Sequence, residues 1–182
     1  KYDRIIQENI RPLTLSLIKK ILGIRNAEIT ILPRKLQRTL EKETDLVILV
    51  SYDDGRKIIY NVEWQTYNDP GMSFRMLLQQ SILYSLYKKP VTGIVVYTGR
   101  EKMNMKDVIF YEGFYYKYSL IDLSCYDPGD FLDSEVPDEI IMAILAGKPK
   151  AIKIRSLVRN ILIKLHALLG DNASELNRKI VQ

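Results

Sequence analysis

The sequence predicts an α/β fold, in which helices cover the faces of a central sheet. Residues 45–64 hold two apolar, β-branched runs on either side of the turn sequence Asp-Asp-Gly-Arg, which predicts a hairpin. A helical pattern over residues 73–89 follows, and a continuous β-branched run over residues 91–99 comes next. Apolar residues fill both faces of the strand at residues 46–50, so we expect it to lie inside a sheet covered on both sides.

The segment before the hairpin predicts a helical region and one strand. Asp3 is a candidate helix cap, Pro12 marks a kink or a second helix start, and Gly23 is a candidate helix end. Residues 27–32 form a short β-prone run, and a charged connector leads from them to the hairpin.

The remaining segments predict one more strand and two more helices. Residues 113–124 are β-prone, residues 137–147 predict a short helix, and residues 151–170 predict a basic amphipathic helix. In the earlier helix at residues 73–89, Gln80 is expected as the one polar residue on the apolar stripe. The last helix is expected to bury Ile154, Leu157, Val158, Ile161, Leu162, Leu165 and Leu169, with Lys153, Arg155, Arg159 and Lys164 largely off that stripe.

Composition excludes several classes of protein. The chain has 182 residues, of which 47% are apolar and 27% charged, as expected for one globular domain. Its single cysteine, Cys125, rules out an internal disulfide and a multi-cysteine zinc site, and it favours a reducing compartment. No apolar run reaches the roughly 20 residues that span a bilayer, and the start lacks the apolar core of a signal peptide. We therefore expect a cytoplasmic protein that does not enter the membrane.

The formal net charge of +5 is unevenly distributed. Residues 147–182 hold eight basic and two acidic side chains, which leaves nineteen basic and twenty acidic side chains in residues 1–146. A basic tail is compatible with contact to nucleic-acid phosphates, although a solvated basic helix face is the commoner explanation.

An acid pair is expected at one end of the hairpin. Side chains at alternate strand positions share a face, so Glu63 and Gln65 project together while Trp64 points away. A hairpin closed at residues 53–56 also brings Asp45 beside Glu63. Two neighbouring carboxylates repel each other unless a cation lies between them, and oxygen ligands suit Mg²⁺ or Mn²⁺. The alternative is an ordinary solvated acid at a strand end, with Asp45 capping the connector.

Taken together, these features resemble the PD-(D/E)XK nuclease superfamily. The stretches LQRTLEKETDLVILV, IIYNVEWQTYNDPGMSFRML and PVTGIVVYTG look like its branch of recombination-promoting nucleases and transposase-like proteins. The resemblance implies a restriction-endonuclease-like core with a mixed central β-sheet flanked by helices. It covers residues 1–146 as a nuclease-like domain, which leaves residues 147–182 as a C-terminal helical extension packed on the same domain.

Site residues follow from the resemblance position by position. Asp45 matches the motif aspartate, Glu63 matches the second acid, and Gln65 stands where a lysine is usual. A glutamine amide can position water but supplies neither charge nor acid or base chemistry, which is the main departure from the pattern. Glu8 matches a helical acid that some members add to the site, and a solvated helix acid is an equal alternative. Thr44 replaces the motif proline, which mainly changes the backbone before the strand.

The resemblance also implies a mechanism and partners. Asp45, Glu63 and the carbonyl of Trp64 would hold Mg²⁺ (or Mn²⁺), and Gln65 would orient the attacking water. Arg75 could hold a flanking phosphate of DNA, with a structural ion pair as the alternative. The same phosphate-binding role is open to three basic residues of the tail, for which a solvated helix face is the favoured interpretation: Lys153, Arg155 and Arg159.

The expected function is a metal-dependent DNA endonuclease linked to recombination or mobile DNA. A catalytically inactive nuclease-fold module that binds DNA or protein is the alternative. A weaker third reading is an assembly protein whose basic helix docks a partner. Catalysis requires Asp45 and Glu63 to converge on an open cleft, whereas a binding module would tolerate their burial in salt bridges. The sequence leaves a homodimer open.

Overall fold

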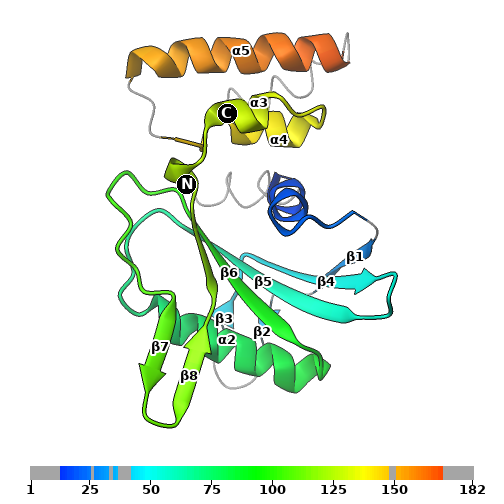
Figure 1. The fold of residues 1–182 in the computed structure, drawn as a ribbon, viewed down its shortest axis with the longest axis vertical. Coiled ribbons are helices and arrows are strands. Elements are labelled where there is room, and N and C mark those ends of the chain that lie inside the picture. The colour runs from blue at the N-terminus through cyan, green and yellow to red at the C-terminus, as the bar shows by residue number, and fades with distance from the viewer. Residues whose placement is uncertain (1–12, 26, 33–34, 37–41, 148–150, 170–182) are drawn as a thin grey trace. The chain divides into compact units, whose positions relative to one another are not determined.

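The structure is a computed structural model, and its described residues belong to two compact units (Figure 1). It describes residues 13–25, 27–32, 35–36, 42–147 and 151–169. We call residues 26–122 the sheet unit, and residues 1–25 with 123–182 the helical unit. These units are defined by their contacts. The expected nuclease-like domain of residues 1–146 and its extension of residues 147–182 stay a prediction.

The sheet unit is built on a mixed five-stranded sheet. Its spatial order is β1 (Ala27–Leu32), β4 (Leu46–Tyr52), β5 (Lys57–Gln65), β6 (Val91–Tyr97) and β9 (Ser119–Asp122). The first three strands are antiparallel neighbours, whereas β5, β6 and β9 run parallel. The predicted α/β class and mixed sheet are thereby confirmed.

The central hairpin forms as the sequence predicts. Tyr52 N donates to Arg56 O at 2.9 Å, and Gly55 has a φ of +84°, a value that favours glycine. The register that follows pairs Leu46 with Val62. Strand β4 lies between β1 and β5, and it is buried on both faces, since the adjacent residues Val47 and Ile48 are both 0% exposed.

Helix α2 (Met72–Tyr87) connects β5 to the parallel strand β6 and packs on one face of the sheet. It begins after Gly71, and it ends at Lys88, whose φ of +52° breaks the helical path ahead of Pro90. The strand, helix, strand unit is therefore confirmed.

The β-prone run at residues 113–124 is not one strand, which corrects the prediction. It divides into β8 (Phe114–Lys117) and β9, and β8 pairs with β7 (Val108–Tyr111) in a separate hairpin. The break falls at Tyr118, whose N donates to Asp107 O at 3.0 Å and whose hydroxyl donates to Lys106 O at 2.7 Å. These long-range bonds redirect the chain and outweigh its uniform β propensity. The connector before β4 contributes β2 (Lys35–Leu36) and β3 (Lys42–Glu43).

The helical unit holds the helix of residues 13–22, the 3₁₀ helix η1 (Leu123–Cys125), and helices α3 (Pro128–Leu132), α4 (Pro137–Met142) and α5 (Ala151–Leu169). The first helix ends at Gly23, with a φ of +62°, as predicted. Helix α4 is shorter than expected. Helix α3 was not expected from the sequence, and Asp127 caps it by accepting from Gly129 N.

Helix α5 follows the amphipathic pattern in part, and Val158, Leu162 and Leu169 of the expected stripe are half-buried. Leu157, Ile161 and Leu165 are buried, whereas Ile154 is 42% exposed although it was expected on the buried stripe. Within the described part of the chain, no helix is both long and apolar enough to cross a membrane.

Candidate active site

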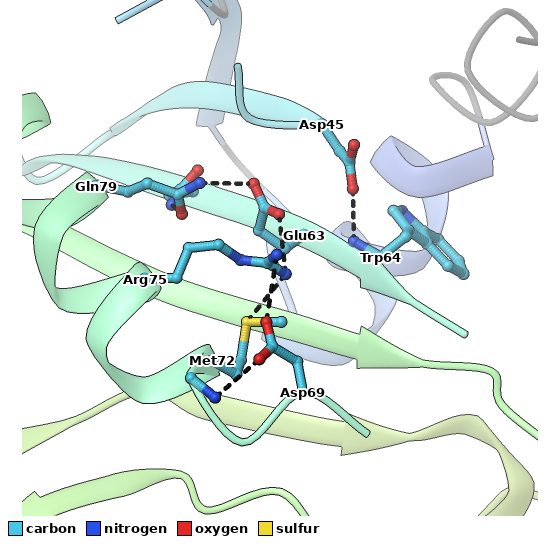
Figure 2. Close-up of polar contacts among 9 residues, drawn as sticks. Asp45, Glu63, Trp64, Asp69, Met72, Arg75 and Gln79 are labelled. Atoms are coloured by element: carbon cyan, nitrogen blue, oxygen red, sulfur yellow. Dashed lines mark hydrogen bonds and ion pairs between the residues drawn. The ribbon is translucent and has the colours of Figure 1, made fainter. Parts of the chain in front are cut away.

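Asp45 is fixed at the end of the central hairpin. Because Leu46 pairs with Val62, Asp45 lies beside Glu63 on the neighbouring strand, as the hairpin predicts. Asp45 Oδ2 accepts a hydrogen bond of 2.7 Å from the backbone N of Trp64 (Figure 2). A carboxylate that accepts a backbone N–H is held in one orientation by a charge-assisted bond.

Glu63 lies under helix α2 and is only 6% exposed. Figure 2 shows its carboxylate between two side chains of that helix. Gln79 Nε2 donates to Glu63 Oε1 at 2.9 Å, and Arg75 Nη2 lies 3.7 Å from Glu63 Oε2. Both carboxylate oxygens therefore face α2.

The surroundings of Glu63 disfavour its charged form. Burial raises the pKa of Glu63 from its ordinary value of 4.5 to about 7, and the negative charge of Asp45 acts in the same direction. The positive charge of Arg75 and the hydrogen bond from Gln79 lower the pKa of Glu63, but they do not balance the burial. The acid pair therefore has an incompletely compensated charge near neutral pH, which a bound cation would relieve.

Two residues of this network were missed by the sequence analysis. Asn61 Nδ2 donates to Gln79 Oε1 at 2.9 Å, so the chain of hydrogen bonds runs from Asn61 through Gln79 to Glu63. Strand alternation placed Asn61 on the face of Glu63 and could have identified it. Gln79 carried no such signal, because the helical pattern placed Gln80 on the buried stripe, whereas Gln79 is 1% exposed.

Some buried polar atoms of this face have no hydrogen-bond partner among the described residues. They are Asn61 Oδ1, Gln65 Oε1 and Arg75 Nε. Gln65 is 6% exposed and follows Glu63 by two positions, so strand alternation puts both side chains on one face. Buried polar groups are normally satisfied by protein, water or an ion. These atoms without partners therefore indicate that this face is suited to bind water, an ion or another polar ligand.

Arg75 forms ion pairs with two acids. Its guanidinium lies 3.3 Å from Asp69 Oδ2 and 3.7 Å from Glu63 Oε2 (Figure 2). Asp69 is held in turn, since its Oδ1 accepts from Gly71 N at 2.8 Å. This arrangement fits the structural ion pair that the sequence left open for Arg75, and it makes the guanidinium a competitor of any cation at Glu63.

The donor set is compatible with a hard divalent cation. Mg²⁺ is usually held by one or two carboxylates, with water and substrate phosphate as the other ligands. Asp45 and Glu63 supply the two carboxylates, and Gln65 supplies an orphaned amide oxygen on the face of Glu63. Among the described residues, no group of three or more His, Cys, Asp or Glu side chains could hold a metal ion.

The other expected site residues all belong to the helical unit. Arg155 and Arg159 are exposed on α5, in the helical unit, whereas Asp45 and Glu63 belong to the sheet unit. Glu8 lies outside the described residues, as does the side chain of Lys153. The expected phosphate contacts of these residues stay predictions.

Comparison with protein-family models, curated proteins and solved structures gave no match.

Proposed function

We propose that this chain is a divalent-metal-dependent nuclease, with a restriction-endonuclease-like core, that hydrolyses DNA phosphodiester bonds at Asp45 and Glu63. The observation that carries the proposal is the juxtaposition of two carboxylates from adjacent strands, one of them buried with a pKa raised to about 7. The element order also supports it: three antiparallel strands carry the acid pair, and a helix then leads to a parallel strand.

Mg²⁺ or Mn²⁺ would be held by Asp45 and Glu63, with the carbonyl of Trp64 as the expected third protein ligand. When bound, such an ion supplies a Lewis acid for the phosphate and lowers the pKa of a coordinated water.

The chain's own residues orient these groups. The backbone N of Trp64 fixes Asp45, and Gln79 fixes one oxygen of Glu63. Gln65 can orient water through its amide, although it cannot take up a proton at neutral pH. Arg75 has the nearer acid, Asp69, as an alternative anchor, so its guanidinium remains paired if Glu63 binds a cation.

The first test compares plasmid cleavage by the wild-type chain, Glu63→Gln and Glu28→Gln, with Mg²⁺, Mn²⁺ or chelator present. Glu63→Gln keeps the shape of the side chain and removes its charge, so we expect cleavage to fall at least a hundredfold, as for the loss of one major transition-state interaction. Glu28 is exposed on β1, and its variant should cut like the wild type. Equal metal-dependent cleavage by Glu63→Gln would refute the assignment of this site.

A second readout does not need activity. Trp64 is the only tryptophan of the chain, and its backbone N bonds to Asp45. Its fluorescence should respond to Mn²⁺ in the wild type and in Glu28→Gln, and the response should be lost in Glu63→Gln. The same titration curve in all three proteins would place the metal elsewhere.

A non-catalytic module that binds DNA or protein is a second candidate, and one observation favours it. Glu63 is 6% exposed and ion-paired with Arg75, which is the burial that a binding module would tolerate. Failure of the wild type to cut plasmid or to respond to Mn²⁺, with binding to DNA intact, would support this second function over the nuclease.

A further inference from the structure

A groove with a volume of about 620 Å³ lies in the sheet unit, beside the start of α2. Phe74 of α2 lines one side, and Val108 and Ile109 of β7 line another. Met105 and Lys106, which precede β7, complete this wall. The volume is in the range of a small-molecule or single-nucleotide site.

The walls of the groove are held by hydrogen bonds. The carbonyl of Lys106 accepts from Ser73 Oγ at 2.8 Å and from Tyr118 Oη at 2.7 Å, which ties this segment to α2. On the neighbouring loop, Asn68 Oδ1 accepts from Asn104 N at 2.8 Å, and Asn68 Nδ2 donates to Lys102 O at 3.1 Å. The groove is therefore built before any ligand arrives.

Among the described residues, the lining combines apolar side chains with the polar side chains of Asn68, Ser73 and Asn104 and one cation, Lys106. Met105 and Ile109 are nearly buried, whereas the ring of Phe74 is 63% exposed. Lys106 is exposed, and no acidic residue is among the described residues that line the groove. An exposed ring beside a cation suits a flat aromatic group that carries a negative charge, which is the chemistry of a nucleotide.

The groove shares its elements with the acid pair. Phe74 precedes Arg75, the residue paired with Glu63, and Asn68 precedes Asp69, the other partner of Arg75. Beyond the groove, the β7–β8 hairpin displays Phe110, which is 77% exposed, against Tyr115, which is 66% exposed, with ring centroids 6.5 Å apart. Exposed rings on this hairpin extend the surface on which bases can stack.

We propose that this groove binds an unpaired base of the DNA substrate, with Phe74 stacked on the base and Lys106 at its phosphate. The inference rests on the proposed nuclease function and specifies its substrate class. A base inside continuous duplex is already stacked and paired, so its transfer to the groove requires unstacking. The protein therefore favours DNA with single-stranded segments over continuous duplex.

The test measures fluorescence anisotropy of a labelled oligothymidine of about 12 nucleotides, a length that covers one single-strand site. The full chain is used, with chelator present so that no cutting occurs. Phe74→Ala is expected to weaken binding on the order of tenfold, and Phe74→Trp to keep it. Lys106→Gln is expected to weaken binding and to reduce its dependence on salt by about one cation.

Two matched controls separate the groove from the general surface. Tyr84→Ala removes another exposed ring of α2, which is 56% exposed and outside the groove, and Lys57→Gln removes an exposed lysine at the start of β5. Both should bind the oligonucleotide like the wild type. Equal losses of affinity in the test and control variants would show that the groove does not bind the base. Tighter binding of the wild type to continuous duplex than to the oligonucleotide would also contradict the proposal.

Three further outcomes are decisive. If Phe74→Ala changes the oligomeric state in sedimentation and leaves DNA binding unchanged, the groove holds a second copy of the chain and the proposal is wrong. If the wild type cuts plasmid while Phe74→Ala binds the oligonucleotide normally, the proposed role of the groove is wrong and the proposed nuclease function is supported. If the wild type does not cut but binding depends on Phe74, the proposed role of the groove is supported and the proposed nuclease function is wrong.

Discussion

Two stretches of helix α2 rest on the same face of one sheet but contact opposite kinds of surface. Near its end, Leu83 belongs to a buried apolar cluster with Val47, Ile59 and Val91. Nearer its start, Gln79 and Arg75 contact the buried Glu63. The helix thus changes from an apolar to a polar contact within about two turns.

The two surfaces differ in their effect on stability: the apolar one stabilises the fold, and the polar one costs stability. Burial of the Leu83 cluster removes apolar surface from water and stabilises the folded state. The polar contacts of Gln79 and Arg75 do the reverse, because they surround Glu63 where burial raises its pKa to about 7. On the same face, Asn61 Oδ1 and Gln65 Oε1 have no partners among the described residues. This destabilising polar cluster beside a well-packed apolar one is a reason to propose the functional site here.

The largest expected effect on stability is at the apolar end. Leu83 is fully buried, so Leu83→Ala should lower the free energy of unfolding by roughly 2 to 5 kcal/mol through lost burial and a cavity. Leu86→Ala is the control, because Leu86 is 45% exposed on the same helix and should change stability by less than about 0.5 kcal/mol. Urea unfolding followed by Trp64 fluorescence measures both. Similar losses in the two variants would show that the Leu83 cluster does not anchor the helix.

Removal of the buried charge should have the opposite sign and depend on pH. The folded pKa of Glu63, about 7, exceeds its ordinary value of 4.5, so ionisation favours the unfolded chain. The folded protein is more stable with protonated than with ionised Glu63. This contribution to the free energy of unfolding is fully present below pH 4.5 and is lost as pH rises to about 7. Glu63→Gln should escape this loss and gain up to about 3 kcal/mol on the wild type at pH 8, with little difference at pH 4.

This second prediction is measured by urea unfolding of both proteins at pH 4, 6 and 8 with chelator present. Glu28→Gln serves as the control, since Glu28 is exposed and should show no such pH dependence relative to the wild type. A constant difference between Glu63→Gln and the wild type across this range would mean that the pKa of Glu63 is the same in the folded and the unfolded protein.

The fold was predictable wherever local chemistry decides the outcome. The tight turn at Gly55 and the β-branched runs on either side of it specified the hairpin, and Gly23 specified a helix end. The β7–β8 hairpin was not predictable, because the break at Tyr118 depends on hydrogen bonds to Lys106 and Asp107 that local sequence does not encode.

The candidate site was predictable for its strands but not for its helix. Once the hairpin turn is known, the register alone brings Asp45 to Glu63. Which helix residue faces Glu63 depends instead on how α2 is rotated about its axis. Neighbouring positions on a helix differ by about 100°, so the rotation decides between Gln79 and Gln80. Periodicity favoured Gln80, whereas packing against the sheet selected Gln79.

These two adjacent glutamines give the smallest and most specific prediction. Gln79→Met should lower the free energy of unfolding by about 2 kcal/mol, because Asn61 Nδ2 loses its acceptor and Glu63 Oε1 loses a donor. Loss of that donor also raises the pKa of Glu63 further, so the loss of stability with rising pH should extend to higher pH than in the wild type. Gln80→Met should be neutral or stabilising, since Gln80 Oε1 is buried and has no partner among the described residues. Urea unfolding at pH 6 and 8 tests both variants, and a larger loss for Gln80→Met would show that α2 has the rotation that periodicity predicts and that Gln79 does not orient Glu63.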